Sequence, residues 1–368
     1  MKLFSIWNFI SYLFQRLHNK IQTLTRIFNH GGRSLRQIKG YEIDSPDILI
    51  IGPGEMMIPT QSWGAVEIVI ANQMKNLENR GYAVSLLNSW FYRDWILLFI
   101  RKPKFVLCHY DVFTFRLFIY RTIFRVPCYV VTHFGYTRFP EKWSGQYRRI
   151  LKFANKLDGV IALSEFDRKA IEAVVDKEKL FCVPNGGEDL FETSFRPKIE
   201  TKSQRSYICL GKVEPRKRQV QLAKLISEID LDITFVGPIV DSNFYELDER
   251  TKLKFVGPWT RKQVQELLPT FDYLILFSDG EADALVLHEA MFAGLNICVS
   301  LEAIGSVSPK LPWVHQFSNL HDFISAYSSE SLKYFEDRTA IREYAAAQSN
   351  WDLNVERLLN LFHQSKFP

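Results

Sequence analysis

The sequence has few of the features that mark the common classes of metal, redox and membrane proteins. Its five cysteines form no Cys-x-x-Cys pair, and its eight histidines include no His-Glu-x-x-His motif. This spacing argues against metal sites and disulfide scaffolds, so we interpret the cysteines as free thiols of a reducing compartment. No apolar run reaches the roughly 20 residues that a membrane-spanning helix needs.

A dinucleotide-binding fingerprint is also missing. The loop after the first apolar run reads Gly52-Pro53-Gly54-Glu55-Met56-Met57, so Met57 stands where the third glycine of Gly-x-Gly-x-x-Gly would be. Pro53 lacks the amide N–H that a phosphate-binding loop uses. The loop therefore argues against a nicotinamide or flavin dehydrogenase.

Acidic residues are absent from the first 41 positions, which hold seven lysines and arginines. Apolar residues recur there at three- and four-residue steps, a pattern typical of an amphipathic helix. We interpret residues 1–41 as a basic amphipathic N-terminal extension that binds a membrane surface through residues 1–40. Packing on the protein's own core and a targeting role are the alternatives. The net charge of +5 comes without a nucleic-acid-binding motif, so we expect no nucleic-acid partner.

The rest of the chain alternates apolar strand-like runs with helical patterns, as in parallel doubly wound sheets. The pattern predicts helices at 66–80 and 143–157. Residues 192–206 are polar and charged, and they read as a linker. We predict an α/β chain of two Rossmann-like domains at 45–195 and 205–344, with a C-terminal helix at 345–368 completing the first. The predicted strands are 47–51, 82–87, 105–108, 129–132, 159–163, 180–183, 207–210, 233–236, 253–256, 273–277 and 296–300.

Two glutamates separated by seven residues, Glu281 and Glu289, follow the strand predicted at 273–277. We expect Asp283 to cap a helix over 284–293 that Gly294 ends. Glu281 then lies in the loop at the carboxyl end of a strand, and Glu289 lies one to two turns into the helix. Open α/β sheets bind ligands at this edge, with anions at helix N-termini.

A second strand end carries cations. Gly211 and Lys212 follow the strand at 207–210, and Lys217 comes five residues after Lys212. A glycine lets the chain turn sharply there, and cations at this edge would neutralise a diphosphate. A solvated basic loop is the alternative interpretation.

Three further strand or helix ends carry candidate site residues. His133 ends a strand of the first domain, where it would face the ligand edge. Gly64 stands at a helix start and lets a ligand approach the backbone, or serves only the turn. Pro258 and Trp259 follow a second-domain strand and form either a wall for a nucleobase or a surface turn.

Taken together, these motifs resemble the retaining nucleotide-sugar glycosyltransferases of family 4, which have the GT-B fold. The resemblance covers about residues 45–362 and is most specific at Glu281-x7-Glu289 with the following Ala290-Met291-Phe292-Ala293-Gly294. Pro184-Asn185-Gly186 and Ser62-Trp63-Gly64-Ala65 support it. It implies two domains facing across a cleft and transfer of a sugar, with retained configuration, to a glycan or lipid-linked acceptor. We expect no metal and no cofactor beyond the donor, and a cytoplasmic protein peripheral on a membrane.

The resemblance also implies roles for individual residues. Lys212 and Lys217 would hold the donor diphosphate, Glu289 would bind the ribose, and Glu281 would contact the donor sugar. His133 would touch the donor sugar near the acceptor. The remaining expected donor-binding residues are Gly64, Gly211, Pro258, Trp259 and the backbone amides of Asp283, Ala284 and Leu285.

This sequence departs from the family pattern at three places. Lysine stands at Lys212 where arginine is common, and Arg218 replaces a usual glycine. Ala282-Asp283-Ala284 replaces Gly-Phe-Gly, so Asp283 either binds sugar hydroxyls or caps the helix. A nucleotide-sugar epimerase and a non-catalytic scaffold of the same fold remain the alternative functions.

Overall fold

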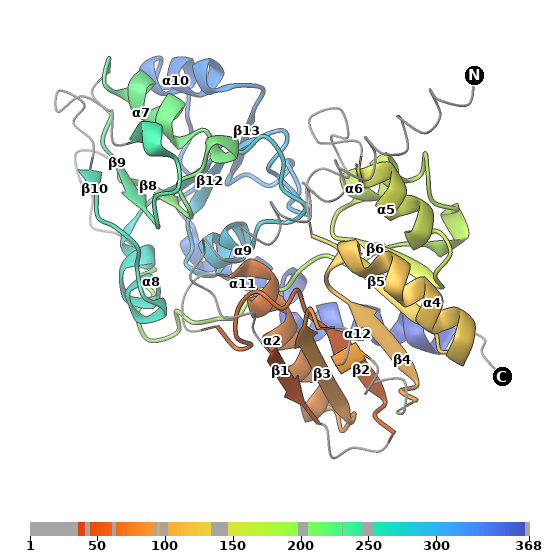
Figure 1. Ribbon diagram of the computed structural model, residues 1–368. Coiled ribbons are helices and arrows are strands. Elements are labelled where there is room, and N and C mark those ends of the chain that lie inside the picture. The colour runs from red at the N-terminus through yellow and green to blue at the C-terminus, as the bar shows by residue number, and fades with distance from the viewer. Residues whose placement is uncertain are drawn as a thin grey trace, which may run out of the picture.

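The computed structural model describes residues 36–40, 45–60, 64–91, 94–95, 102–133, 146–197, 205–229, 231–244 and 254–364. This part of the chain forms a seven-stranded and a six-stranded sheet, each flanked by helices. Figure 1 shows them as two lobes, with α9 and α11 lying between. The predicted α/β class with two Rossmann-like domains is confirmed.

The first sheet has the order β1-β3-β2-β4-β5-β6-β7. All neighbouring strands are parallel except β1, which pairs antiparallel with β3 at the edge. Apolar runs form the parallel strands because both faces of the sheet are covered. The strands are β1 Arg36–Lys39, β2 Ile48–Ile51, β3 Val84–Ser89, β4 Phe105–Cys108, β5 Cys128–Thr132, β6 Gly159–Ala162 and β7 Leu180–Cys182. The helices are α2 Ala65–Asn79, α4 Thr114–Phe124, α5 Gln146–Ala154 and α6 Glu165–Ile171, with short 3₁₀ turns η1 Asp111–Phe113 and η4 Lys177–Lys179.

The second sheet is parallel throughout, in the order β10-β9-β8-β11-β12-β13. Its strands are β8 Tyr207–Leu210, β9 Ile233–Val236, β10 Lys254–Phe255, β11 Tyr273–Leu276, β12 Asn296–Ser300 and β13 Val314–Phe317. The helices are α7 Gln219–Ile226, α8 Arg261–Leu267, α9 Leu285–Phe292, α10 Leu320–Ser328 and α11 Arg338–Gln348. Short 3₁₀ turns are η5 Pro215–Lys217, η6 Ser242–Phe244 and η7 Leu268–Thr270.

The last helix, α12 (Trp351–Gln364), returns to the first domain. Val355 and Leu358 are buried in the same apolar cluster as strands β2 and β3. Gln73 of α2 donates to the side-chain oxygen of Asn354, 2.9 Å away and buried. The chain therefore crosses between the domains twice, once after β7 and once between α11 and α12.

The predicted N-terminal extension differs from the structure at its end. Residues 36–39, placed by the sequence in the N-terminal extension, form the edge strand β1. The remaining prediction for 1–35 lies outside the described residues.

No helix within the described ranges is long and apolar enough to cross a membrane. All five cysteines are free, and four of them are buried.

Candidate functional site

The site is built where two neighbouring strands of the second sheet end. Strands β8 and β11 are parallel partners, with Tyr207 opposite Tyr273. Their carboxyl ends therefore meet at one edge, and so do the loops that follow them. The backbone N–H of Asp279 donates to the carbonyl of Arg216 at 2.7 Å, which joins the two loops directly.

Glu281 and Lys217, both predicted site residues, meet at this edge. A carboxylate oxygen of Glu281 lies 3.7 Å from the Lys217 ammonium and 2.9 Å from the guanidinium of Arg216. Arg216 also donates to the hydroxyl of Ser278 at 3.1 Å and to the carbonyl of Gly280. Arg216 thus fixes the loop that carries Glu281.

Glu214 balances the cations of the β8 loop. It lies 3.1 Å from the ammonium of Lys212 and 2.8 Å from the guanidinium of Arg216. Burial would raise the pKa of Glu214, but the charges of Arg216, Lys212 and Lys217 outweigh it and hold the pKa below its ordinary value. Glu214 therefore stays ionised among these three cations.

Gly211 gives the Lys217 ammonium room. Its φ is 147°, and a Cβ added there would lie 3.0 Å from the Lys217 Nζ. A side chain at this position would therefore be strained and would push the ammonium away.

The predicted cap of α9 is wrong. Ala284, not Asp283, is the N-cap, and it makes no side-chain cap bond. The Asp283 carboxylate is instead turned into the protein, where Asn185 N, Ser306 N and Oγ, and His288 Nε2 contact it at 2.8 to 3.1 Å. Leu285 is the first residue of α9, so the amides of Ala284 and Leu285 stand at a helix start without a side-chain cap.

Glu289 lies in α9, and its carboxylate pairs with Arg261 at the first position of α8. Its side chain is 13% exposed, so little of it reaches water. Pro258 is exposed, whereas Trp259 is partly buried, with its ring centroid 6.3 Å from that of Phe271. The loop that holds Pro258 and Trp259 leads into α8, whose Arg261 contacts Glu289.

The first domain presents a histidine pair at the carboxyl edge of its sheet. His109 follows β4 and His133 follows β5, which are parallel neighbours. Nδ1 of His109 lies 2.8 Å from Nε2 of His133. Burial lowers the pKa of His133 to about 3, and burial together with His133 lowers that of His109 well below its ordinary value. Both rings are therefore neutral near pH 7.

Gly64 is the N-cap of α2, with a φ of 149°. A Cβ there would lie 2.8 Å from the Oε2 of Glu67, which is buried in the first turn of the helix. Burial raises the pKa of Glu67, with Glu55 adding to the effect. The start of α2 therefore has an open backbone beside a carboxyl group that resists ionisation.

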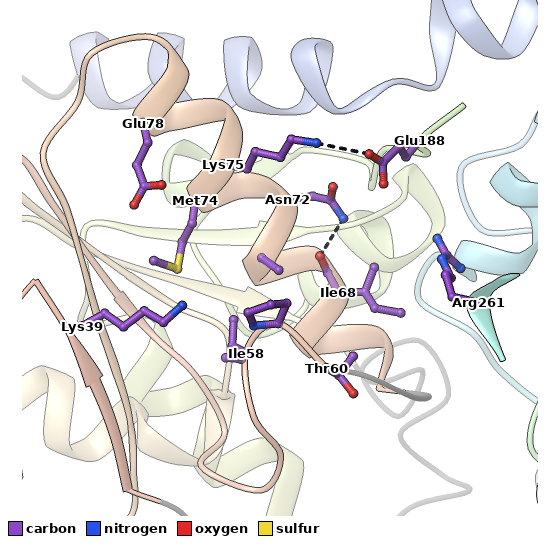
Figure 2. Close-up of a pocket in the computed structure, with 12 residues that line it drawn as sticks. Lys39, Ile58, Thr60, Ile68, Asn72, Met74, Lys75, Glu78, Glu188 and Arg261 are labelled. Atoms are coloured by element: carbon purple, nitrogen blue, oxygen red, sulfur yellow. Dashed lines mark hydrogen bonds and ion pairs between the residues drawn. The ribbon is translucent and has the colours of Figure 1, made fainter. Parts of the chain in front are cut away.

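A cavity of about 400 Å³ lies along α2 on the side of Arg261. Figure 2 shows Lys75 pointing to Glu188, with Arg261 across the opening from Ile68. The Lys75 ammonium lies 3.3 Å from Glu188. Arg261, which pairs with Glu289, also lines this cavity and so links it to the site described above.

The structure thus brings Gly211, Lys212, Lys217 and Glu281 together, and it sets Glu289 beside Arg261. Within the described ranges, the hydrogen bonds of Gly64 and His133 stay inside the first domain. Over those same ranges, no three His, Cys, Asp or Glu side chains are grouped to hold a metal ion. The expectation that no metal is needed stays a prediction.

Comparison with known proteins finds similarity in structure and none in sequence. No protein-family model matches the chain, and a search of curated proteins gives no match. Sucrose-phosphate synthase from Thermosynechococcus elongatus superposes with a TM-score of 0.67 at 15% identity, over 86% of this chain and 98% of that one. Anabaena HepE, solved in complex with UDP, gives 0.64 at 15% identity over 86% and 99%. The lipopolysaccharide outer core galactosyltransferase WaaB gives 0.62 at 17% identity over 86% and 99%.

The chain has the GT-B fold. At these identities the likeness establishes the fold alone. Three polar residues of this GT-B chain were missed in the sequence: Arg216, Arg261 and His109. His109 was open to prediction, because it ends a strand just as His133 does. Arg216 lies in a basic loop and Arg261 lies at the polar start of a helix. Nothing in the sequence near either residue indicates that its guanidinium pairs with a glutamate.

Proposed function

We propose that the protein is a retaining glycosyltransferase that moves a sugar from a nucleoside-diphosphate sugar to a glycan or lipid-linked acceptor. The observation that carries the proposal is the cluster of Lys212, Arg216, Lys217 and Glu281 at the carboxyl edge of β8 and β11. This cluster lies beside the start of α9, which has no side-chain cap, in a chain with the GT-B fold. Cations and helix amides together suit a diphosphate.

In this proposal the β8 loop stabilises the leaving group. The chemical step breaks the bond between the anomeric carbon and a diphosphate oxygen and forms a bond from that carbon to an acceptor hydroxyl oxygen. Negative charge grows on the departing diphosphate, which takes up the hydroxyl proton. Lys212 and Lys217 face that charge, while Gly211 leaves room for the Lys217 ammonium. Because the ion pairs hold the lysines before substrate arrives, little reorganisation is needed during the reaction. No metal enters the proposal.

The α9 segment would bind the rest of the donor. Glu289 accepts hydrogen bonds from the ribose hydroxyls, and Arg261 holds its carboxylate in place. The backbone amides at Asp283, Ala284 and Leu285 meet the sugar or phosphate, and Pro258 and Trp259 flank the base. The Asp283 carboxylate itself has no part in sugar binding, because it is fully buried.

The first domain would complete the site. Gly64 approaches the diphosphate from the start of α2, and His133 touches the donor sugar near the acceptor. His133 acts there as a neutral hydrogen-bonding group, because its pKa of about 3 keeps the ring uncharged at pH 7. Retention is tested by reading the anomeric configuration of the product by NMR once a donor is known.

Membrane association of residues 1–40 remains a proposal. A deletion should end at residue 34, because Arg36–Lys39 form β1 and pair with β3. We expect the full chain to float with anionic liposomes and the shortened chain to stay behind. Equal flotation of both proteins would contradict an N-terminal anchor. Circular dichroism of the shortened chain checks that the fold is kept.

The test of the donor site is thermal stabilisation by UDP, GDP, ADP and CMP, since a ligand of the folded state raises Tm by mass action. One diphosphate is expected to raise Tm. The double variant Lys217→Ala/Glu289→Ala is expected to lose the shift. Lys262→Ala should keep it, because Lys262 is exposed and its ion pair is with Glu266, outside the proposed site. If no nucleotide stabilises the wild type, the proposed donor site is wrong and a scaffold role is favoured.

A further inference from the structure

Asp283 stands in the candidate donor loop, yet its carboxylate points away from solvent with a side-chain exposure of 0%. One oxygen accepts from the backbone N–H of Asn185 at 2.8 Å and contacts His288 Nε2 at 3.1 Å. The other accepts from the N–H and hydroxyl of Ser306 at 3.0 and 2.8 Å. A buried carboxyl group with four polar partners is costly to disturb.

His288 extends this contact to a third part of the chain. Its Nε2 meets Asp283, and its Nδ1 is hydrogen-bonded to the hydroxyl of Ser349. The ring is 1% exposed and lies in α9, one residue before Glu289. Asp283 and Ser349 therefore hold the two nitrogens of one imidazole from opposite sides.

Asn185 and Ser349 mark the two places where the chain passes between the domains. These crossings are bonded to each other, because Gly187 N donates to the carbonyl of Ser349 at 2.6 Å. They are also close-packed: a Cβ at Gly186 would lie 2.7 Å from the backbone of Asn350. The Asp283–His288 pair thus joins the donor loop to both crossings at their point of contact.

The donor loop also contacts the first domain directly. Ala282 is 2% exposed and belongs to the apolar cluster that includes Val183 and Val355. The loop is consequently bound on one side by Arg216 and Lys217, through Glu281, and on the other by the crossings. A change in the angle between the domains would have to move it.

We propose that Asp283 and His288 are positioning residues that couple the donor loop, residues 281–285, to the two interdomain crossings. The inference rests on the proposed function, since it takes this loop as the one that binds the donor. Through these two side chains, the backbone amides at the start of α9 and the Glu289 carboxylate keep a fixed place relative to the first domain. Donor affinity then depends on the angle between the two domains, and donor binding in turn favours one angle.

The first test needs no nucleotide. Asp283→Asn keeps the size of the side chain but exchanges an acceptor oxygen for a donor, so at least one of its partners loses its bond. We expect amide hydrogen exchange to rise about tenfold at 183–191 and 346–352 as well as at 281–287. Phe323→Leu, a change in the fully buried core of the second domain, is the matched control for lost stability. Unchanged exchange at the crossings would overturn the coupling, whatever the protein binds.

The second test separates positioning from stability. For the nucleoside diphosphate that stabilises the wild type, Asp283→Asn and Ser349→Ala should raise Kd and donor KM about tenfold, with kcat changed less than about twofold. Ser349→Thr keeps the hydroxyl and should restore the wild-type value, and Phe323→Leu should leave Kd unchanged. An unchanged Kd in Asp283→Asn would overturn the positioning role. If the wild type binds no nucleotide, the proposed function is wrong, and so is the link to donor binding. The hydrogen-exchange result still decides whether the donor loop is coupled to the two crossings.

Discussion

The guanidinium of Arg216 lies 2.9 Å from the carboxylate of Glu281, across the gap between the loops that follow β8 and β11. The first loop leaves its strand through Gly211, and the second leaves its strand through the polar residues Ser278 and Asp279. The ion pair joins them, and side-chain exposures of 28% and 14% shield it in part from water. The cations and the glutamate are therefore aligned before any ligand arrives.

Removing Arg216 should destabilise the second domain more than removing its neighbour Arg218. Arg216→Ala leaves Glu281 and Glu214 short of a partner, and we expect a loss of about 2 kcal/mol, somewhat below the cost of breaking a fully buried pair. Among the described residues Arg218 pairs with Asp279, a partly exposed contact, so Arg218→Ala should cost about 1 kcal/mol or less. Urea unfolding of both variants measures the difference. Equal losses would mean that Arg216 is not the residue that holds the two loops together.

Gly211→Ala should weaken nucleotide binding as well as stability. At a φ of 147° the added methyl group would be strained and would lie 3.0 Å from the Lys217 ammonium. The matched control is Gly81→Ala, where φ is 85° and nothing lies within 4 Å of the added atom. Both changes should cost about 1–2 kcal/mol of unfolding free energy. Only Gly211→Ala should also reduce the Tm shift given by a nucleoside diphosphate, and a full shift there would contradict the close approach.

The fold was largely open to prediction because its strands are continuous apolar runs, as in Ile48-Leu49-Ile50-Ile51, which are buried on both faces. Two strands were not predicted because they are not continuous apolar runs. Strand β1 reads Arg-Gln-Ile-Lys and β13 reads Val-His-Gln-Phe; each lies at a sheet edge, and most of its residues are only partly buried or exposed. Pairing with a neighbour, and not local pattern, makes them strands.

The site was predictable only where residues end strands. Glu281, Lys217 and His133 could be placed at the ligand edge because parallel strands share that edge. The direction of a side chain could not be predicted. Asp283 has the residue type and position of a helix cap, yet Asn185 and Ser306, 98 and 23 residues away in sequence, provide its hydrogen bonds instead. Contacts between residues so far apart in the sequence cannot be predicted from the residues around Asp283.

The C-terminal helix should be essential to the first domain. Leu358 of α12 is 1% exposed within the cluster under strands β2 and β3, so Leu358→Ala should lower the free energy of unfolding by about 3 kcal/mol. Leu361 is only partly buried in the same helix and should cost clearly less when changed to alanine. Chemical denaturation compares them. Equal, small effects would show that α12 adds little to the core.

The histidine pair should make the protein sensitive to mild acid. The pKa of His133 is lowered to about 3 by burial, and that of His109 is lowered well below the ordinary value of 6.5 by burial and by His133. Between pH 6.5 and about 3 the unfolded chain therefore binds protons that the folded chain does not. The stability due to the neutral pair is complete above pH 6.5 and is lost as the pH falls through this window, by up to about 1.4 kcal/mol per pH unit for each proton.

Urea unfolding at pH 7.5, 6.5 and 5.5 measures this slope. His133→Asn removes one of the two groups, so its slope below pH 6.5 should be shallower than that of the wild type by up to one proton. His321→Asn, at an exposed position of α10, should leave the slope as it is. A wild-type stability that stays flat from pH 7.5 to 5.5 would mean that the pair takes up its proton without unfolding. The two rings, 2.8 Å apart at the ends of β4 and β5, would then share a positive charge at the ligand edge.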